Sequence, residues 1–160
     1  MESNYRNILI AIPPVSHEWY EQPADVIRKA AASLCAAKNV KLIFLGVFSL
    51  EQEVGTGEVN LLPPENMMEI VKGQEKKHAD DVRNYVRWFA ENGVPYTIVM
   101  AQGDPAEVIA QKAQEYNADL ILMGYHHKTS IFDIFSPDVA GRTIKQAHCD
   151  VMLVTAHKGK

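Results

Sequence analysis

The sequence has few cysteines, no long apolar run and no excess of positive charge. Its two cysteines, Cys35 and Cys149, lie far apart in apolar segments. This excludes a disulfide framework and predicts two buried, reduced thiols. No apolar run approaches the roughly 20 residues that a membrane-spanning helix needs. The first residues, Met-Glu-Ser-Asn-Tyr-Arg, do not resemble a signal peptide, so we expect a cytoplasmic protein.

The charge balance excludes another class of partner. The chain has 16 lysines and arginines against 20 acidic residues, a net charge of −4 and a pI of about 5.8. This charge provides no field that attracts nucleic acid. With 160 residues, 47% of them hydrophobic, the chain fits one globular domain spanning residues 1–160.

Apolar runs alternate with helical patterns along the chain. Continuous apolar runs indicate strands that are buried on both faces, and apolar residues at i, i+3 and i+4 indicate helices. The expected strands cover residues 6–12, 40–48, 94–101, 119–123 and 149–154, whereas the expected helices cover 24–38 and 65–92 and begin at Pro105 and Pro137. This alternation predicts an α/β fold, a five-stranded parallel sheet with four helices distributed over both faces.

Three positions allow these assignments to be checked. Asp104 is predicted to be the N-cap of a helix, because Pro105 suits the first helical position. Leu122 is expected to be buried in the fourth strand, so Leu122→Asp should destabilise the fold by several kcal/mol. We expect Asp119→Lys, at the start of that strand, to have little effect.

A motif near the C-terminus resembles the signature of the universal stress protein family. It consists of Met123, Gly124, His127, Pro137, Asp138 and Val139. Family members that bind ATP have Gly-x2-Gly-x9-Gly-Ser/Thr here, and backbone N–H groups at these glycines grip the phosphates. The resemblance implies a Rossmann-like fold of the adenine nucleotide alpha hydrolase type. It also implies strand order 3-2-1-4-5, with the ligand site between strands 1 and 4.

The chain keeps Gly124 and the motif spacing but departs from the family at the other positions. Pro137 has no N–H, and Asp138 places a carboxylate where a phosphate would lie. The Cβ of His127 restricts a loop position where glycine would be free. Pro13 stands where the family has an aspartate that binds the adenosine. We therefore expect a degenerate pocket without a cofactor. It is lined by Pro13, Met123, Gly124, His126, His127, Lys128, Pro137, Asp138 and Val139.

The same loop and the helix after it carry residues that suit two other kinds of site. Lys128, Arg142 and Thr143, together with neighbouring hydroxyls, could hold a phosphate, so ATP or AMP binding by a nucleotide switch or slow ATPase is the alternative. His126 and His127 suggest a metal, but adjacent side chains in an extended segment point in opposite directions. We therefore expect no metal site, and the sequence contains no recognisable catalytic residues.

The last strand and the loop before the last helix are the expected contact surfaces. Residues 151–154 form an apolar edge strand, and the family commonly dimerises through this strand. Ile131, Phe132 and Phe135 form an apolar patch in an otherwise polar loop and are candidates for protein contacts. The resemblance thus implies a homodimeric stress-response or regulatory module that does not bind ATP and acts through protein or small-ligand binding.

Overall fold

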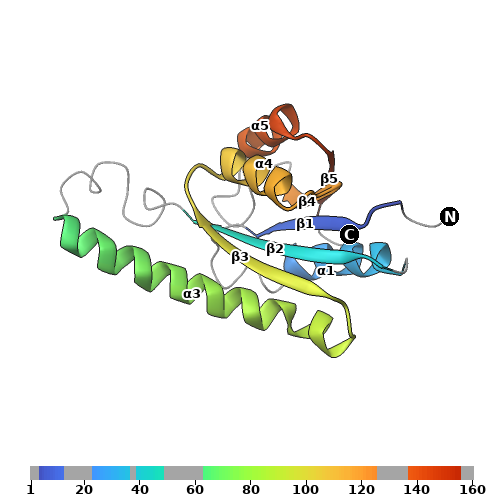
Figure 1. Cartoon of the computed structure of the whole chain (residues 1–160), viewed down its shortest axis with the longest axis horizontal. Coiled ribbons are helices and arrows are strands. Elements are labelled where there is room, and N and C mark those ends of the chain that lie inside the picture. The colour runs from blue at the N-terminus through green and yellow to red at the C-terminus, as the bar shows by residue number, and fades with distance from the viewer. Residues whose placement is uncertain (1–3, 13–22, 37–38, 49–62, 126–136, 156–160) are drawn as a thin grey trace, which may run out of the picture.

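The computed structural model describes residues 4–12, 23–36, 39–48, 63–125 and 137–155. Strands and helices alternate along these segments (Figure 1). In chain order they are β1 (Asn7–Ile12), α1 (Pro23–Leu34), β2 (Lys41–Phe48), α3 (Pro64–Glu91), β3 (Tyr96–Gln102), α4 (Pro105–Glu115), β4 (Leu120–Tyr125), α5 (Pro137–Gln146) and β5 (Asp150–Thr155). The predicted alternation is confirmed.

All five strands form one parallel sheet in the order β3-β2-β1-β4-β5, as predicted. The strand β1 lies at the centre, where Ile8 pairs with Leu120 and Ala11 pairs with Met123. Residues 8–12 are at most 1% exposed, because helices cover both faces of the sheet. This double burial explains why the central strands have no polar face.

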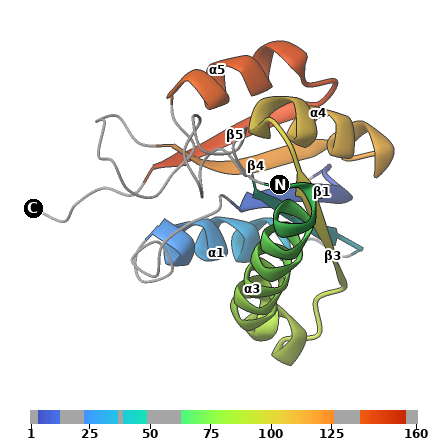
Figure 2. The same ribbon diagram turned by 90° about the vertical axis from the view of Figure 1, so that its left-hand side faces the viewer.

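The helices of the described segments divide into two layers (Figure 2). The helices α1 and α3 cover one face of the sheet, and α4 and α5 cover the other. Alternate residues of β1 enter the two cores: Ile8 and Ile10 face α1 and α3, whereas Leu9 and Ala11 face α4 and α5. Leu122 is also fully buried, as predicted.

The long helix α3 packs on the sheet only through its second half. His78, Val82, Tyr85 and Phe89 are buried, and their spacing places them on one side of the helix. The first half extends past the sheet (Figure 1), and Met68 there is 62% exposed. The apolar stripe therefore predicted the helix correctly, but only half of the stripe enters the core.

The structure corrects the prediction for Asp119. Its carboxylate accepts hydrogen bonds from the backbone N–H groups of Arg6 and Asn7, at 2.9 Å and 3.1 Å. These groups precede or begin β1, so Asp119 connects the start of β4 to the start of the central strand. Replacement by lysine would remove this acceptor and leave the two N–H groups without it.

Both cysteines are free, but they are half-buried rather than fully buried. Burial raises the pKa of the Cys35 and Cys149 thiols. Each is therefore a weak nucleophile at neutral pH, since the thiolate is the reactive form. Among the helices of the described segments, none has the length and apolar character needed to cross a membrane.

Candidate functional site

The sheet has its switch point between β1 and β4. These neighbouring strands run in parallel, but β1 leads to α1 on one face and β4 leads to α5 on the other. Their carboxyl ends lie at Ile12 and Tyr125. In open α/β sheets the chain diverges at such a point and leaves a crevice for a ligand.

Three of the predicted pocket residues lie together at this edge. Met123 and Gly124 are buried near the end of β4. Val139, in the first turns of α5, is half-buried and packs against the core cluster that contains Met123. The strand end and the start of α5 are therefore in contact, as the motif spacing implied.

Other predicted residues fall outside the described segments. They are Pro13, His126, His127 and Lys128 of the pocket, and Ile131, Phe132 and Phe135 of the apolar patch. Their roles remain predictions from the sequence.

The first turn of α5 carries the residues that depart most clearly from a phosphate-binding pattern. Pro137 is the first helical residue and contributes no N–H. Asp138 follows, and its side chain is 76% exposed. A helix N-terminus attracts an anion through free N–H groups and a positive dipole end. Here the protein supplies its own carboxylate at that end, which opposes the approach of a phosphate.

Arg142, one turn further along α5, is held by the start of α4. Its guanidinium donates two hydrogen bonds to the carboxylate of Asp104, at 2.8 Å and 3.0 Å. Asp138 and Glu107 lie 3.8 Å and 4.0 Å from the same guanidinium. The bonds from Arg142 lower the pKa of Asp104, and Asp104 raises the pKa of Arg142. This cation is surrounded by carboxylates of the protein itself.

Thr143 is also engaged within the protein. Its side chain is fully buried, and its hydroxyl donates a hydrogen bond to the backbone oxygen of Val139 at 2.7 Å. Both side chains that were weighed for a phosphate site therefore have internal partners, and a phosphate site at Arg142 and Thr143 remains a prediction from the sequence.

The bridge between α4 and α5 was missed by the sequence analysis. Asp104 was correctly predicted as the N-cap of α4, and it accepts a hydrogen bond from the N–H of Glu107 at 3.2 Å. Its second role, the pairing with Arg142, joins residues 38 positions apart. No local spacing indicates such a pair.

The described residues also bear on metal binding. Within the segments that the structure describes, no three or more histidine, cysteine or acidic side chains gather where they could hold a metal ion. The histidine pair of the sequence analysis lies outside these segments.

Comparison with known protein families identifies the chain. The model of the universal stress protein family matches residues 4–155. The chain belongs to the universal stress protein family. A relative, universal stress protein MJ0531 from Methanocaldococcus jannaschii, is 37% identical over 98 residues, which cover 61% of this chain and 58% of the relative. The match thus spans less than two thirds of that protein's length.

Solved structures of universal stress proteins and related chains share the fold. Hypothetical protein MJ0577 superposes with a TM-score of 0.73 at 21% identity, over 97% of this chain and 99% of that one. A universal stress protein family protein from Arabidopsis thaliana, with AMP bound, gives a TM-score of 0.61 at 16% identity, over 94% and 92% of the two chains. At these identities the similarity establishes the fold alone.

Proposed function

We propose that this universal stress protein is a non-enzymatic regulatory module that does not hold the triphosphate of ATP. It acts by binding a protein or a small ligand. The observation that supports this proposal is the start of α5, formed by Pro137 and the exposed carboxylate of Asp138. By the resemblance in the sequence, these two residues stand at the family's phosphate-binding glycine and hydroxyl positions.

The charges around this helix start support the same proposal. Arg142 is paired with Asp104, and both Glu107 and Asp138 lie within 4.0 Å of it. A phosphate approaching Arg142 would compete for its charge with a bidentate carboxylate, which is among the stronger hydrogen-bonded pairs in proteins. It would also meet two further carboxylates. These charges support the proposal that the site does not hold a triphosphate.

The proposal is tested by nucleotide binding to the wild type and to a restored variant. The variant carries His127→Gly, Pro137→Gly and Asp138→Ser, which together return the family motif. Calorimetric titration with ATP and magnesium should show no micromolar binding by the wild type and measurable binding by the variant. Asp80→Ser, an exposed change on α3, is the matched control and should behave like the wild type.

A melting curve shows whether ATP binds to the wild-type protein. A ligand at a hundredfold excess over its dissociation constant raises the free energy of unfolding by about 2.7 kcal/mol. Stabilisation of this size by ATP in wild-type protein, stripped of copurified nucleotide, would refute the proposal.

Binding of AMP is the second candidate function. The Arabidopsis relative has AMP bound, and a monophosphate needs fewer backbone donors than a triphosphate. Titration with AMP alongside ATP separates the two functions. If AMP stabilises the protein and ATP does not, the protein would be a nucleotide switch. Its site would then bind a monophosphate although Pro137 and Asp138 replace the family's phosphate-binding residues.

We further propose that the protein is a homodimer formed through β5 (Asp150–Thr155). This strand lies at one edge of the sheet, and among the described strands it pairs only with β4. Residues 151–155 are half-buried and carry no charge. An apolar strand at the edge of a sheet favours pairing with another strand, and a second copy provides one. A cytoplasmic location remains a prediction from the sequence.

A further inference from the structure

A glycine in the interior of β2 leaves room for a methionine of the neighbouring strand. Gly46 pairs in register with Met100 of β3. A Cβ on Gly46 would lie 2.7 Å from Cε and 2.8 Å from Sδ of Met100. Such distances are too short for real contacts, so the Met100 thioether occupies the space that a side chain at residue 46 would need.

This thioether lies at the middle of the contact between α3 and the sheet. Toward the C-terminal end of α3, Phe89 packs on Phe44, with ring centroids 5.2 Å apart. At the other end, His78 stacks on Phe48, with centroids 6.0 Å apart. Between these two ring contacts the facing strand residue is Gly46, so the methionine completes the packing there.

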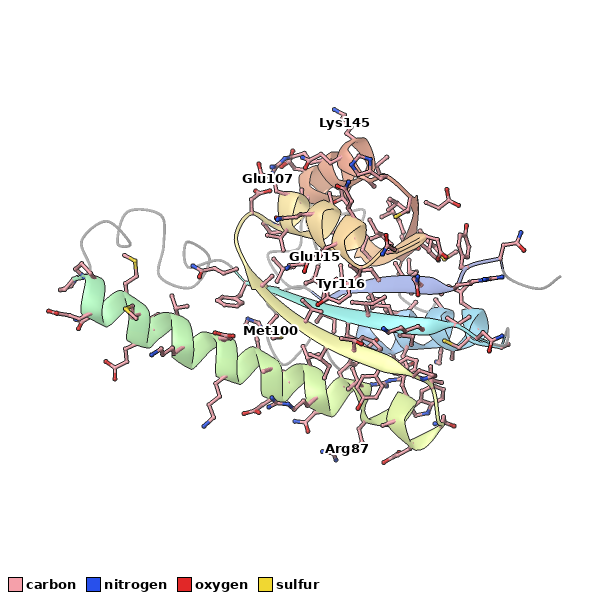
Figure 3. All side chains as sticks on the ribbon, viewed as in Figure 1. Arg87, Met100, Glu107, Glu115, Tyr116 and Lys145 are labelled. Atoms are coloured by element: carbon pink, nitrogen blue, oxygen red, sulfur yellow. The ribbon has the colours of Figure 1, made fainter. Side chains whose placement is uncertain are left out.

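Val82 is the residue of α3 that faces this middle position. Its Cγ2 atom lies 3.4 Å from the Cβ position of residue 46. Met100 packs against the core cluster that contains Val82, and it lies on the α3 side of β3 (Figure 3). The thioether therefore fills space at the contact between β2, β3 and α3. We call this contact the seam.

The seam lies at the edge of the sheet. Among the described strands, β3 pairs only with β2, and Met100 is half-buried. In contrast, Met123 in β4 is fully buried and Met68 is 62% exposed. Met100 thus combines partial exposure with a packing role, as Met152 of β5 also does, whereas Met123 and Met68 each have only one of these properties. The contact with Gly46 is what distinguishes Met100.

We propose that Met100 is a reversible oxidation site that controls how firmly α3 packs on the sheet. The oxidant is hydrogen peroxide. The sulfur lone pair attacks one peroxide oxygen, the O–O bond breaks, and an S–O bond forms. The proton of the attacked oxygen passes to the departing hydroxide, which leaves as water, so the sulfur loses the two electrons that the peroxide gains.

Oxidation places a polar sulfoxide oxygen in an apolar seam. The thioether is flexible and apolar, but the sulfoxide is polar and needs a hydrogen-bond partner. Gly46 and Val82 present carbon at this seam, so the oxygen favours a rearrangement that exposes it to water. The adjoining contact between His78 and Phe48 lies at the carboxyl end of β2, on the same sheet edge as the candidate site. Oxidation should therefore loosen α3 on the side nearest that site.

The experiment exposes the wild type and Met100→Leu to graded hydrogen peroxide. Peptide mass mapping locates each sulfoxide, and melting curves follow stability. We expect Met68 to be oxidised first without a change in melting temperature. Oxidation of Met100 should follow, before Met123, and lower the melting temperature by roughly 3 to 6 °C. Methionine sulfoxide reductase should restore the original value.

Two further variants make the test specific. Met68→Leu removes the more exposed thioether and should keep the full response, whereas Met100→Leu should abolish it. Met100→Gln mimics the polar sulfoxide and should lower the melting temperature without peroxide. Hydrogen exchange should then rise in the second half of α3.

Either of two results would overturn the proposal. One is resistance of Met100 until Met123 is also oxidised, which would mean that the thioether is reached only after unfolding. The other is complete oxidation of Met100 with unchanged melting temperature and unchanged hydrogen exchange in α3.

Discussion

At the scale of single residues, Asp119 stabilises the start of the central strand. Its carboxylate accepts the N–H groups of Arg6 and Asn7. We predict that Asp119→Ala lowers the free energy of unfolding by about 1 to 3 kcal/mol, because two backbone donors lose a charged acceptor. Urea denaturation measures the change. Asp80→Ala, which removes only an exposed ion pair on α3, should have an effect below about 1 kcal/mol. Equal effects of the two substitutions would contradict this role for Asp119.

The pairing of Asp104 with Arg142 makes the free energy of unfolding depend on pH in the acid range. Arg142 lowers the pKa of the Asp104 carboxyl in the folded protein below the usual value for aspartate. A lowered folded-state pKa means that the contribution is present above the unfolded-state pKa, near 3.9, and is lost as pH falls through the folded-state value. We predict that the wild type loses more stability than Arg142→Met between about pH 5 and pH 2. Parallel stability curves for the two proteins over this range would exclude the contribution.

At the scale of elements, two glycines with different surroundings should respond oppositely to alanine. Gly73 lies within α3, and a Cβ there would have no neighbour within 4 Å. Gly73→Ala should therefore stabilise the protein by about 0.5 to 1 kcal/mol, since glycine is costly inside a helix. Gly46→Ala should destabilise it by up to about 1 kcal/mol, because the new methyl group would displace the flexible end of the Met100 side chain from its place in the core. Thermal or chemical unfolding gives the change in the free energy of unfolding for each variant. Changes of the same sign in both variants would contradict this account of Gly46.

At the scale of the whole molecule, the two edges of the sheet allow the proposed dimer to be tested. Val154→Lys places a charge on β5, whereas Ile98→Lys places the same charge on β3 at the opposite edge. Sedimentation velocity should show a dimer for the wild type and for Ile98→Lys, and a monomer for Val154→Lys. Both residues are half-buried and pack against the same core cluster, so the two variants lose comparable packing, and circular dichroism should first establish that each is folded. A monomeric wild type, or loss of the dimer only in Ile98→Lys, would exclude pairing through β5.

The sequence alone determined the elements and their order. Parallel strands buried on both faces are continuous apolar runs, and Asp104 followed by Pro105 marks a helix start whatever the surroundings. The boundaries moved by a few residues, as for the expected strand at residues 94–101, which is observed as Tyr96–Gln102. The strand order came from the family resemblance, and the sheet confirms it.

Only the tertiary structure decided which side chains meet. Arg142 belonged to the alternative phosphate site, and only the packing of α5 beside α4 showed that it pairs with Asp104. The sequence predicted that replacing Asp119 would have little effect, but in the sheet its carboxylate lies beside Arg6 and Asn7 at the start of β1. The contact between Met100 and Gly46 likewise depends on the register of two strands joined through α3. Local patterns report burial and backbone preference, whereas these contacts join segments that become neighbours only when the sheet forms.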